Sequence, residues 1–303
     1  MGALFWKNSN KHFPMRTQAL LGRHAQCDIR VEAPKVSGQH ARLQWVDDAW
    51  EVRDLGSRNG TFVDGRRLEP GGRVAVDTGA MITLARHVAE FELVDSSAPG
   101  AVAVEVQTGI SHFSDGGLLA LPNDENPIVT VFMNGEGEWY IESGNASRVA
   151  VDGEILDADD TKYLLELPNI ETETYQSGTG SPTLDSIALR LGVTPDEEQV
   201  EVTVIVGGHA KRLPVRRYHY LLVTLARAWL AEENVGESMR GWVDRDTLCR
   251  GLEMDPMKLS VEIYRARKQL AALGIQGAAG LIQRRVGTHE IRIGVPNVQV
   301  LKL

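Results

Sequence analysis

Apolar and polar residues alternate over much of the first third of the chain, and the alternation breaks at short runs rich in glycine, serine and asparagine. The clearest apolar positions of this pattern are Ile29, Val31, Ala41, Leu43, Trp45, Trp50 and Val52. A period of two is typical of β-strands that bury one face. The pattern therefore predicts a β domain over residues 1–95, with loops where the strands end.

A second set of strand-like segments follows a small-residue linker at Asp95–Gly100. They are Ala101–Val106, Ile128–Met133, Glu138–Glu142, Arg148–Val151 and Tyr163–Leu167. We therefore predict a second, all-β module over residues 101–169. Residues 170–199 are predicted as a polar linker, centred on Glu171–Pro182, with one short helix at Leu184–Leu191.

The period changes in the last third, residues 200–303. Two strands, at Val200–Val206 and Lys211–Val215, precede a long apolar helix at Tyr218–Leu230. A second helix is predicted within Trp242–Leu252, with Asp244 as its N-cap, and a third from Asp255 to about Leu273. The third helix has one apolar face, formed by Leu259, Ile263, Ala266, Leu270 and Leu273. Two strands, Leu281–Arg285 and Glu290–Ile293, complete an α+β domain.

Three polar islands interrupt the first set of strands. They are Gly22-Arg23, Ser37-Gly38-Gln39-His40 and Gly56-Ser57-Arg58-Asn59-Gly60-Thr61. Loop residues held on a sheet are the usual place for a binding site. A guanidinium matches a phosphate dianion bidentately, a serine hydroxyl adds a hydrogen bond, and an asparagine amide can pair with an extended peptide. The islands therefore predict phosphate binding. Taken singly, each island is more typical of solvated charges and a turn than of a binding site.

In combination, the islands resemble the forkhead-associated (FHA) domain family, whose pattern is G-R, then S-x-x-H, then S-x-N-G-T. The resemblance covers roughly residues 3–95 and implies a β-sandwich that recognises phosphothreonine peptides. By position it implies that Arg23 and Ser37 hold the phosphate, with Gly38, Ser57 and Arg58 beside it. Asn59 would hold the peptide backbone. Gly22, His40 and Gly60 would be structural, and Gly38 stands where some members carry asparagine.

A weak internal echo links the first two β segments. Trp50 is followed by Val63-Asp64-Gly65, and Trp139 is followed at similar spacing by Val151-Asp152-Gly153. Residues 101–169 are then either a degenerate FHA-like sandwich or an ordinary hairpin pattern. The second segment lacks Gly-Arg and Ser-x-x-His, so we predict no phosphate site there.

The third helix and the hairpin after it are similar to the winged-helix effector domain of OmpR/PhoB-type response regulators. The similarity is carried by LSVEIYRARKQL at 259–270 and IQRRVGTHEIRI at 282–293, although the usual G-x-G-Y of the wing is missing. The resemblance implies a recognition helix in the major groove and a wing in the minor groove. The residues that it places against DNA are Lys258, Val261, Tyr264, Arg265, Arg267, Arg284, Arg285 and His289. Glu262 departs from the pattern, which has a neutral or basic residue at that position. A carboxylate there either reads a cytosine amino group or repels phosphate.

Charge is unevenly distributed, although the formal net charge is only −9. Residues 1–95 carry +1, residues 96–199 carry −16 and residues 200–303 carry +6. The basic last third is suited to nucleic acid and the acidic middle is not. A tethered acidic segment is expected to compete with DNA phosphate for Arg265, Arg267, Arg284 and Arg285.

No catalytic pattern accompanies these features. His112, Asp115 and Asp124 are too loosely spaced to indicate an active site, and Cys27 and Cys249 form no metal-binding spacing. We therefore predict a cytoplasmic, non-enzymatic signalling protein with no cofactor, metal or membrane partner. It would bind a phosphothreonine-containing protein (a Ser/Thr kinase or its substrate) and duplex DNA, as a phosphorylation-responsive transcription regulator. The alternative is an interaction scaffold whose winged helix docks a protein partner.

Overall fold

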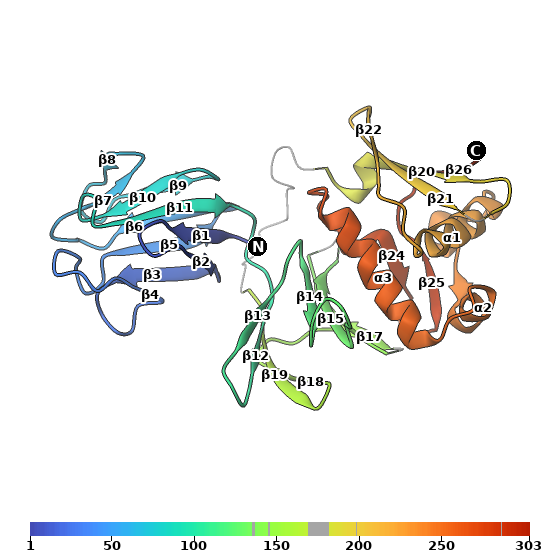
Figure 1. Cartoon of the computed structure of the whole chain (residues 1–303), viewed down its shortest axis with the longest axis horizontal. Coiled ribbons are helices and arrows are strands. Elements are labelled where there is room, and N and C mark those ends of the chain that lie inside the picture. The colour runs from blue at the N-terminus through green and yellow to red at the C-terminus, as the bar shows by residue number, and fades with distance from the viewer. Residues whose placement is uncertain (135–136, 145, 169–181, 198, 286) are drawn as a thin grey trace. The chain divides into compact units, whose positions relative to one another are not determined.

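The computed structural model describes residues 1–303 apart from 135–136, 145, 169–181, 198 and 286. The described residues form a mostly β protein with several sheets and three α-helices near the C-terminus (Figure 1). They separate into two compact units. The first is built on residues 1–102, and the second on residues 103–166 together with the described residues after 181.

The first unit contains two mainly antiparallel sheets with a common core. A six-stranded sheet has the order β2-β1-β11-β10-β7-β8, and a five-stranded sheet has the order β4-β3-β5-β6-β9. Their strands are β1 (Ala3–Trp6), β2 (Lys11–Pro14), β3 (Gln18–Gly22), β4 (Ile29–Arg30), β5 (Ala41–Val46), β6 (Ala49–Asp54), β7 (Thr61–Val63), β8 (Arg66–Arg67), β9 (Arg73–Val76), β10 (Met81–Leu84) and β11 (Ala89–Asp95).

The predicted alternation accounts for this sandwich. In β5 and β6 the inward positions Ala41, Leu43, Trp50 and Val52 are buried, and their neighbours along each strand are more exposed. Trp45 remains half-buried, with its ring edge against Trp50 at a centroid distance of 5.4 Å. Because each strand buries one face only, the two sheets share a single core and leave their loops outside it.

The second unit begins with two four-stranded sheets. One has the order β13-β12-β19-β18 and the other is the meander β14-β15-β16-β17. The strands are β12 (Val102–Glu105), β13 (Ser111–Phe113), β14 (Leu118–Leu121), β15 (Val129–Met133), β16 (Trp139–Ser143), β17 (Ala146–Val149), β18 (Ile155–Ala158) and β19 (Thr161–Glu166). The predicted all-β character of residues 101–169 is confirmed, although the strand expected at Arg148–Val151 lies earlier, at β17.

The remainder of the second unit is α+β. A sheet of order β22-β21-β20-β26 and a small sheet of order β23-β25-β24 share a core with three helices. The elements are β20 (Ile187–Val193), β21 (Val200–Val206), β22 (His209–Arg212), α1 (His219–Ala231), β23 (Val243–Asp244), α2 (Arg245–Gly251), α3 (Pro256–Ala271), β24 (Ile282–Arg284), β25 (Glu290–Ile293) and β26 (Val298–Lys302). Single turns of 3₁₀-helix lie at Leu184–Ser186, Glu237–Met239 and Ala278–Leu281.

Local sequence sets the helix ends. The side chain of Asp244 accepts a hydrogen bond from the Thr247 amide at the start of α2, and Asp255 does the same for Lys258 at the start of α3. The apolar face predicted for the third helix enters the main core of the unit, where Leu259, Ile263 and Leu270 are buried. The three predicted helices and both N-caps are therefore confirmed.

The prediction of a short helix at Leu184–Leu191 is wrong. Only Leu184–Ser186 forms a helical turn, and Ile187–Val193 is strand β20, antiparallel to β21 and parallel to β26. Leucine and alanine favour helices locally, but pairing on both edges overrides that preference. The C-terminal sheet therefore begins before residue 200. The polar linker predicted at Glu171–Pro182 lies outside the described residues, except for Pro182.

Candidate functional site

The three polar islands meet at one end of the first unit. Gly22 ends β3, residues 37–40 lead into β5, and residues 56–60 join β6 to β7. The amide of Arg23 donates to the Ser37 carbonyl at 2.9 Å, and the amide of Arg58 donates to Ser37 Oγ at 3.1 Å. Three segments that are separate in the sequence thus form one continuous loop surface, as their spacing predicted.

His40 holds the second and third of these loops together. It is fully buried; its Nδ1 lies 3.0 Å from the Ser37 amide and its Nε2 3.1 Å from the Gly60 carbonyl. This geometry fits a neutral imidazole that accepts at Nδ1 and donates at Nε2. Burial lowers the pKa of His40, which also favours the neutral form. The structural role predicted for His40 is consistent with these contacts.

Asp54 organises the loop after β6. One carboxylate oxygen accepts from the hydroxyls of Ser57 at 2.6 Å and Thr61 at 2.7 Å. The other accepts from the amides of Gly56 at 2.9 Å and Ser57 at 3.0 Å. Burial alone would raise the pKa of Asp54, but these bonds hold it below its ordinary value. Ser57 is buried with its hydroxyl on Asp54, so the structure does not bring it to the ligand surface, where we had placed it.

Close backbone approach explains two of the glycines. A Cβ on Gly22 would lie 2.3 Å from the Gly38 carbonyl oxygen, which receives the His24 amide at 2.9 Å. Gly60 has φ +84°, and a Cβ there would lie 2.5 Å from Arg67 Nε. Both positions thus need glycine for shape. Nothing lies within 4 Å of a Cβ added at Gly38, so no steric reason requires a glycine there.

The outer surface of the loops carries the charged groups. Arg23 and Arg58 are exposed, and Arg23 Nε donates to the Val36 carbonyl at 3.3 Å. Within the part of the chain that the structure describes, neither guanidinium has a carboxylate partner. Asn59 is also exposed, and its Nδ2 donates to the Lys35 carbonyl at 2.6 Å. One amide hydrogen and the Oδ1 atom remain for a peptide.

The eight residues predicted to face DNA lie in the second unit and divide into two groups. Lys258 and Arg285 are half-buried, and Arg265 and His289 are exposed. Val261, Tyr264 and Arg267 are at most 9% exposed, and the side chain of Arg284 is 8% exposed. Glu262, expected to face DNA, is also buried. Of the four buried members, Tyr264, Arg267 and Arg284 lie against the β14–β17 sheet and are covered by it.

A buried ion-pair cluster joins that sheet to α3 and the hairpin. Glu142 of β16 accepts two hydrogen bonds from Arg267, at 2.8 and 3.0 Å, and its carboxylate lies 3.2 Å from Arg284 Nε. Arg267 also donates to the Ile282 carbonyl at 2.6 Å and stacks over Phe132 at 4.6 Å. Burial alone would raise the pKa of Glu142, yet the two guanidinium groups hold it below its ordinary value.

The next residue along α3, Lys268, makes a second polar contact. Lys268 Nζ is 2.9 Å from carboxylate oxygens of both Asp115 and Asp124, and the Tyr264 hydroxyl donates to Asp124. Burial, and then the Asp124 carboxylate, raise the pKa of Tyr264 well above its ordinary value. Asp115 and Asp124, considered above as loosely spaced catalytic candidates, therefore hold α3. His112 pairs instead with Glu105 at 2.9 Å.

A carboxylate of the middle module contacts two of the four arginines for which we expected acidic groups to compete with DNA phosphate. Arg267 and Arg284 both contact Glu142. Among the residues that the structure describes, Arg265 contacts the Glu125 carbonyl of that module, at 3.3 Å, and Glu262 of its own helix. Arg285 pairs with Glu290 of its own hairpin at 2.9 Å.

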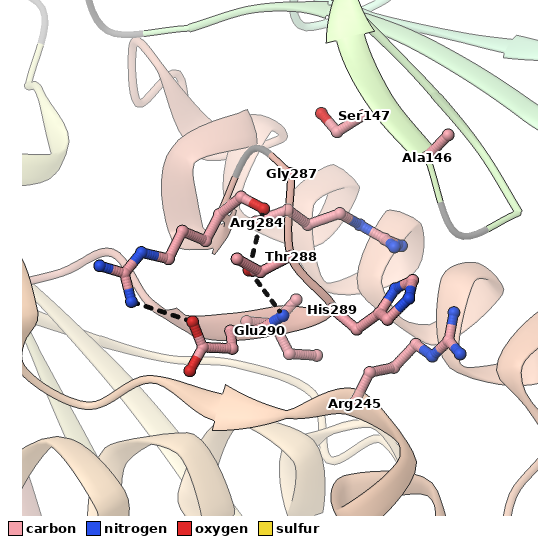
Figure 2. Close-up of a pocket in the computed structure, with 10 residues that line it drawn as sticks. Ala146, Ser147, Arg245, Arg284, Gly287, Thr288, His289 and Glu290 are labelled. Atoms are coloured by element: carbon pink, nitrogen blue, oxygen red, sulfur yellow. Dashed lines mark hydrogen bonds and ion pairs between the residues drawn. The ribbon is translucent and has the colours of Figure 1, made fainter.

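The hairpin formed by β24 and β25 borders a cavity of about 300 Å³. Figure 2 shows Arg284, His289 and Arg245 extending toward the same side of the hairpin, with Ala146 and Ser147 of β17 opposite. Arg245 is 7% exposed and pairs with Asp246 at 2.7 Å. The predicted wing residues Arg284 and His289 thus surround a cavity that β17 partly closes.

Sequence reasoning missed Asp54 in the first unit and Glu142 in the second. No local pattern marks Asp54. A signal for Glu142 was present, because β14 (LLAL) and β15 (VTVF) are continuously apolar or small and thus typical of a sheet buried on both faces. A carboxylate on such a sheet requires cations from another element. No group of three His, Cys, Asp or Glu residues within the described chain is arranged to hold a metal ion, and no described helix is long and apolar enough to cross a membrane.

Comparison with known proteins identifies an FHA domain in the chain, because residues 19–85 match the model of the FHA domain family. The oxoglutarate dehydrogenase inhibitor of Corynebacterium efficiens is 35% identical over 80 residues, which are 26% of this chain and 51% of that protein. The FHA domain-containing protein PS1 of Arabidopsis thaliana is 36% identical over 67 residues, 22% of this chain and 4% of that protein. The chain thus spans about half the length of the first relative and far less of the second.

Solved structures give matches of similar extent. The FHA domain of the CT664 protein from Chlamydia trachomatis is 27% identical and has a TM-score of 0.28, covering 31% of this chain and 96% of that one. Mycobacterium tuberculosis EmbR, in complex with a low-affinity phosphopeptide, is 24% identical and has a TM-score of 0.29, covering 32% of this chain and 25% of that one. The family match stops at residue 85 and does not reach the middle module or the three helices.

Proposed function

We propose that the first unit binds phosphothreonine-containing peptides through the surface formed by Arg23, Ser37, Arg58 and Asn59. The observation that carries the proposal is that the backbone amides of Arg23 and Arg58 both bond to Ser37, which places two exposed arginines on adjoining loops. Charge-assisted hydrogen bonds from arginine to phosphate are strong and geometrically specific. Asn59 is positioned to pair with the peptide backbone.

The proposed activity is recognition without catalysis. The partner is a protein phosphorylated on threonine, either a Ser/Thr kinase or its substrate, and the setting is the cytoplasm. Two cysteines that remain free, Cys27 and Cys249, are consistent with a reducing compartment. The preference for phosphothreonine follows from the FHA match at residues 19–85 and from the resemblance of the islands to the family pattern.

Calorimetry with a phosphothreonine peptide library and its unphosphorylated counterpart tests the proposal. Wild-type protein is expected to bind only the phosphorylated form. Arg23→Ala should weaken binding by about 1.5–3 kcal/mol or more, the contribution of a charged hydrogen bond, with the fold unchanged. Arg16→Ala is the matched control, because Arg16 is exposed at the opposite end of β3. Equal affinities for Arg23→Ala and Arg16→Ala would refute the site.

For the second unit we propose a winged helix that binds duplex DNA through α3 and the β24–β25 hairpin, making the protein a phosphorylation-responsive transcription regulator. The element order supports this proposal, with three helices followed by a hairpin, and so does the exposure of Arg265 on α3 and His289 on the hairpin. The contacts of Arg267 and Arg284 oppose it in the described state, since both side chains are buried against the Glu142 carboxylate. Binding therefore requires that the β14–β17 sheet leave α3.

The competing proposal is an interaction scaffold in which the same helix docks protein. One observation favours it specifically, because α3 already docks a protein element, the β14–β17 sheet of its own chain. The two proposals differ in their response to duplex DNA. A scaffold should not bind it even when Arg267 and Arg284 are released. Whether residues 101–169 are a degenerate FHA-like module stays a prediction, and the FHA match does not extend to them.

A further inference from the structure

We propose that the β14–β17 sheet is an intramolecular cap on the second face of α3, and that its acidic side chains occupy the positions that DNA phosphates would take. This inference rests on the DNA-binding proposal and adds the regulation of that site. The cap comprises the face of the sheet that carries Leu118, Ala120, Phe132, Tyr140 and Glu142, together with Asp115 and Asp124, which flank β14.

Strand register places the five sheet residues on one face. Leu118 pairs with Phe132, which pairs with Tyr140, and Ala120 pairs with Thr130, which pairs with Glu142. Residues directly opposite one another on neighbouring strands share a face of the sheet, and so do residues two apart along a strand. Two adjacent cross-strand rows, one largely apolar and one ending in a carboxylate, therefore form a single surface.

Helix α3 presents a matching stripe. Tyr264, Arg267, Lys268 and Ala271 are separated by three, four and seven residues, so they lie on one side of the helix. The core residues Leu259, Ile263 and Leu270 lie on the other side. Leu118, Ala120 and Phe132 form one buried apolar cluster with Tyr264 and with Ala279, with Ala271 packed against it. The helix is thus buried on two sides, although the sequence predicted only one apolar face.

Charge complementarity makes the contact between α3 and the cap specific. Glu142 is 6% exposed and Arg267 is 2% exposed, and Arg267 would be an uncompensated buried charge without Glu142. Lys268 lies between Asp115 and Asp124. Each cation of the stripe is therefore matched to a carboxylate of the middle module, as it would be matched to a phosphate on DNA.

Opening the cap returns these charges to water but also exposes Phe132, Leu118 and Tyr264. The open state is consequently a minor one, and the apparent DNA affinity of the intact chain is reduced by the fraction of molecules that are open. Weakening the cap should raise that fraction and hence the affinity. Weakening an unrelated acidic pair on the same module should not.

The test uses the full chain and a fluorescein-labelled mixed-sequence duplex, followed by anisotropy between about 50 and 200 mM salt. The cap variants are Glu142→Gln and the double variant Asp115→Asn/Asp124→Asn, whose positions are exposed loop residues. The matched control is Asp157→Asn/Asp160→Asn, which removes the same two charges from exposed positions elsewhere in the module. We expect the cap variants to bind at least tenfold more tightly than wild type, and the control to change affinity less than twofold.

A readout independent of DNA reports the cap itself. A zero-length carbodiimide joins an amine only to a carboxylate in contact with it, so wild-type protein should yield a Lys268–Asp124 or Lys268–Asp115 cross-link by peptide mapping. The yield should fall in Glu142→Gln and should fall in wild type when duplex is added.

The outcomes separate the two proposals. No Lys268 cross-link in wild type, or equal DNA affinities for wild type, cap variants and control, overturns the cap. If the control gains as much affinity as the cap variants, general repulsion by the acidic module explains the effect and the cap is again overturned. If the cross-link forms and falls in Glu142→Gln, but no variant binds duplex at the lowest salt, the cap stands and the DNA-binding proposal is wrong.

Discussion

Arginine side chains contribute to both candidate surfaces, but they are exposed in one unit and buried in the other. In the first unit Arg23 and Arg58 are exposed on loops whose backbones are fixed by Ser37. In the second unit Arg267 and Arg284 are buried on the Glu142 carboxylate. The first surface keeps its cations for a ligand, whereas the second has already satisfied them within its own fold. The same residue type thus indicates an open site in one unit and a closed one in the other.

The difference also lies in what supports each arginine. Arg23 and Arg58 depend on a framework of neutral and anionic groups beneath them, in which His40 and Asp54 make the contacts. Arg267 is itself part of the framework, because it bonds both Glu142 and the Ile282 carbonyl. Loss of an arginine should therefore reduce ligand binding in the first unit and folding stability in the second. Four substitutions or conditions test this contrast.

The largest expected effect is on Arg267. Removing one partner of a buried pair costs about 3–5 kcal/mol. We expect Arg267→Ala to lower the free energy of unfolding by about 3 kcal/mol, near the lower end of this range, because Arg284 still faces Glu142. Hydrogen exchange with mass spectrometry should show faster exchange throughout residues 103–166 and in α3. Arg265→Ala, at an exposed position of the same helix, is the control, and an equal effect in the two variants would contradict the buried role of Arg267.

Gly22→Ala should come next, as a steric change to the first unit. Its added Cβ would meet the Gly38 carbonyl oxygen at 2.3 Å, and a backbone atom cannot move aside as a flexible side chain can. Overpacking of this kind costs about 1–3 kcal/mol. Thermal unfolding of the variant should show the loss, with weaker phosphopeptide binding. Gly38→Ala is the control, since its Cβ meets nothing, and it should unfold like wild type.

Asn59→Ala should have a smaller effect on stability. It removes one hydrogen bond, to the Lys35 carbonyl, for which we expect about 0.5–1.5 kcal/mol. Peptide affinity should fall as well, because Asn59 would pair with the peptide backbone. Calorimetry on the variant measures the loss of peptide affinity. Arg23→Ala is the comparison, because it should lose affinity without losing stability. Unchanged affinity in Asn59→Ala would leave its amide a purely structural group.

The smallest effect should be a dependence of stability on pH. Burial lowers the pKa of His40 from its ordinary value of 6.5, so the unfolded chain binds the proton more readily than the folded one. The stability that neutral His40 contributes is therefore present above about pH 6.5 and declines as the pH falls below it. Asp54 has a lowered pKa and loses its contribution only in more acidic solution. Thermal unfolding of wild type and His40→Gln between about pH 7.5 and 5.5 should show a smaller slope in the variant.

Much of the fold was determined by local sequence. Strand alternation, the positions of the three islands and the caps Asp244 and Asp255 each depend on neighbours a few residues away, so the sequence alone predicted them. The β20 strand shows the limit, because its residues favour a helix until β21 and β26 pair with both of its edges.

The open and closed states of the two arginine surfaces were decided only by the tertiary structure. Motif spacing brought Arg23, Ser37 and Arg58 together, and the structure agrees with it. In α3 the sequence identified basic residues, and in the middle module it identified an excess of acidic residues. It did not reveal that Glu142, 125 residues away along the chain, would be buried against Arg267. Burial is a property of packed surfaces, and no local pattern states which distant element will cover a helix face.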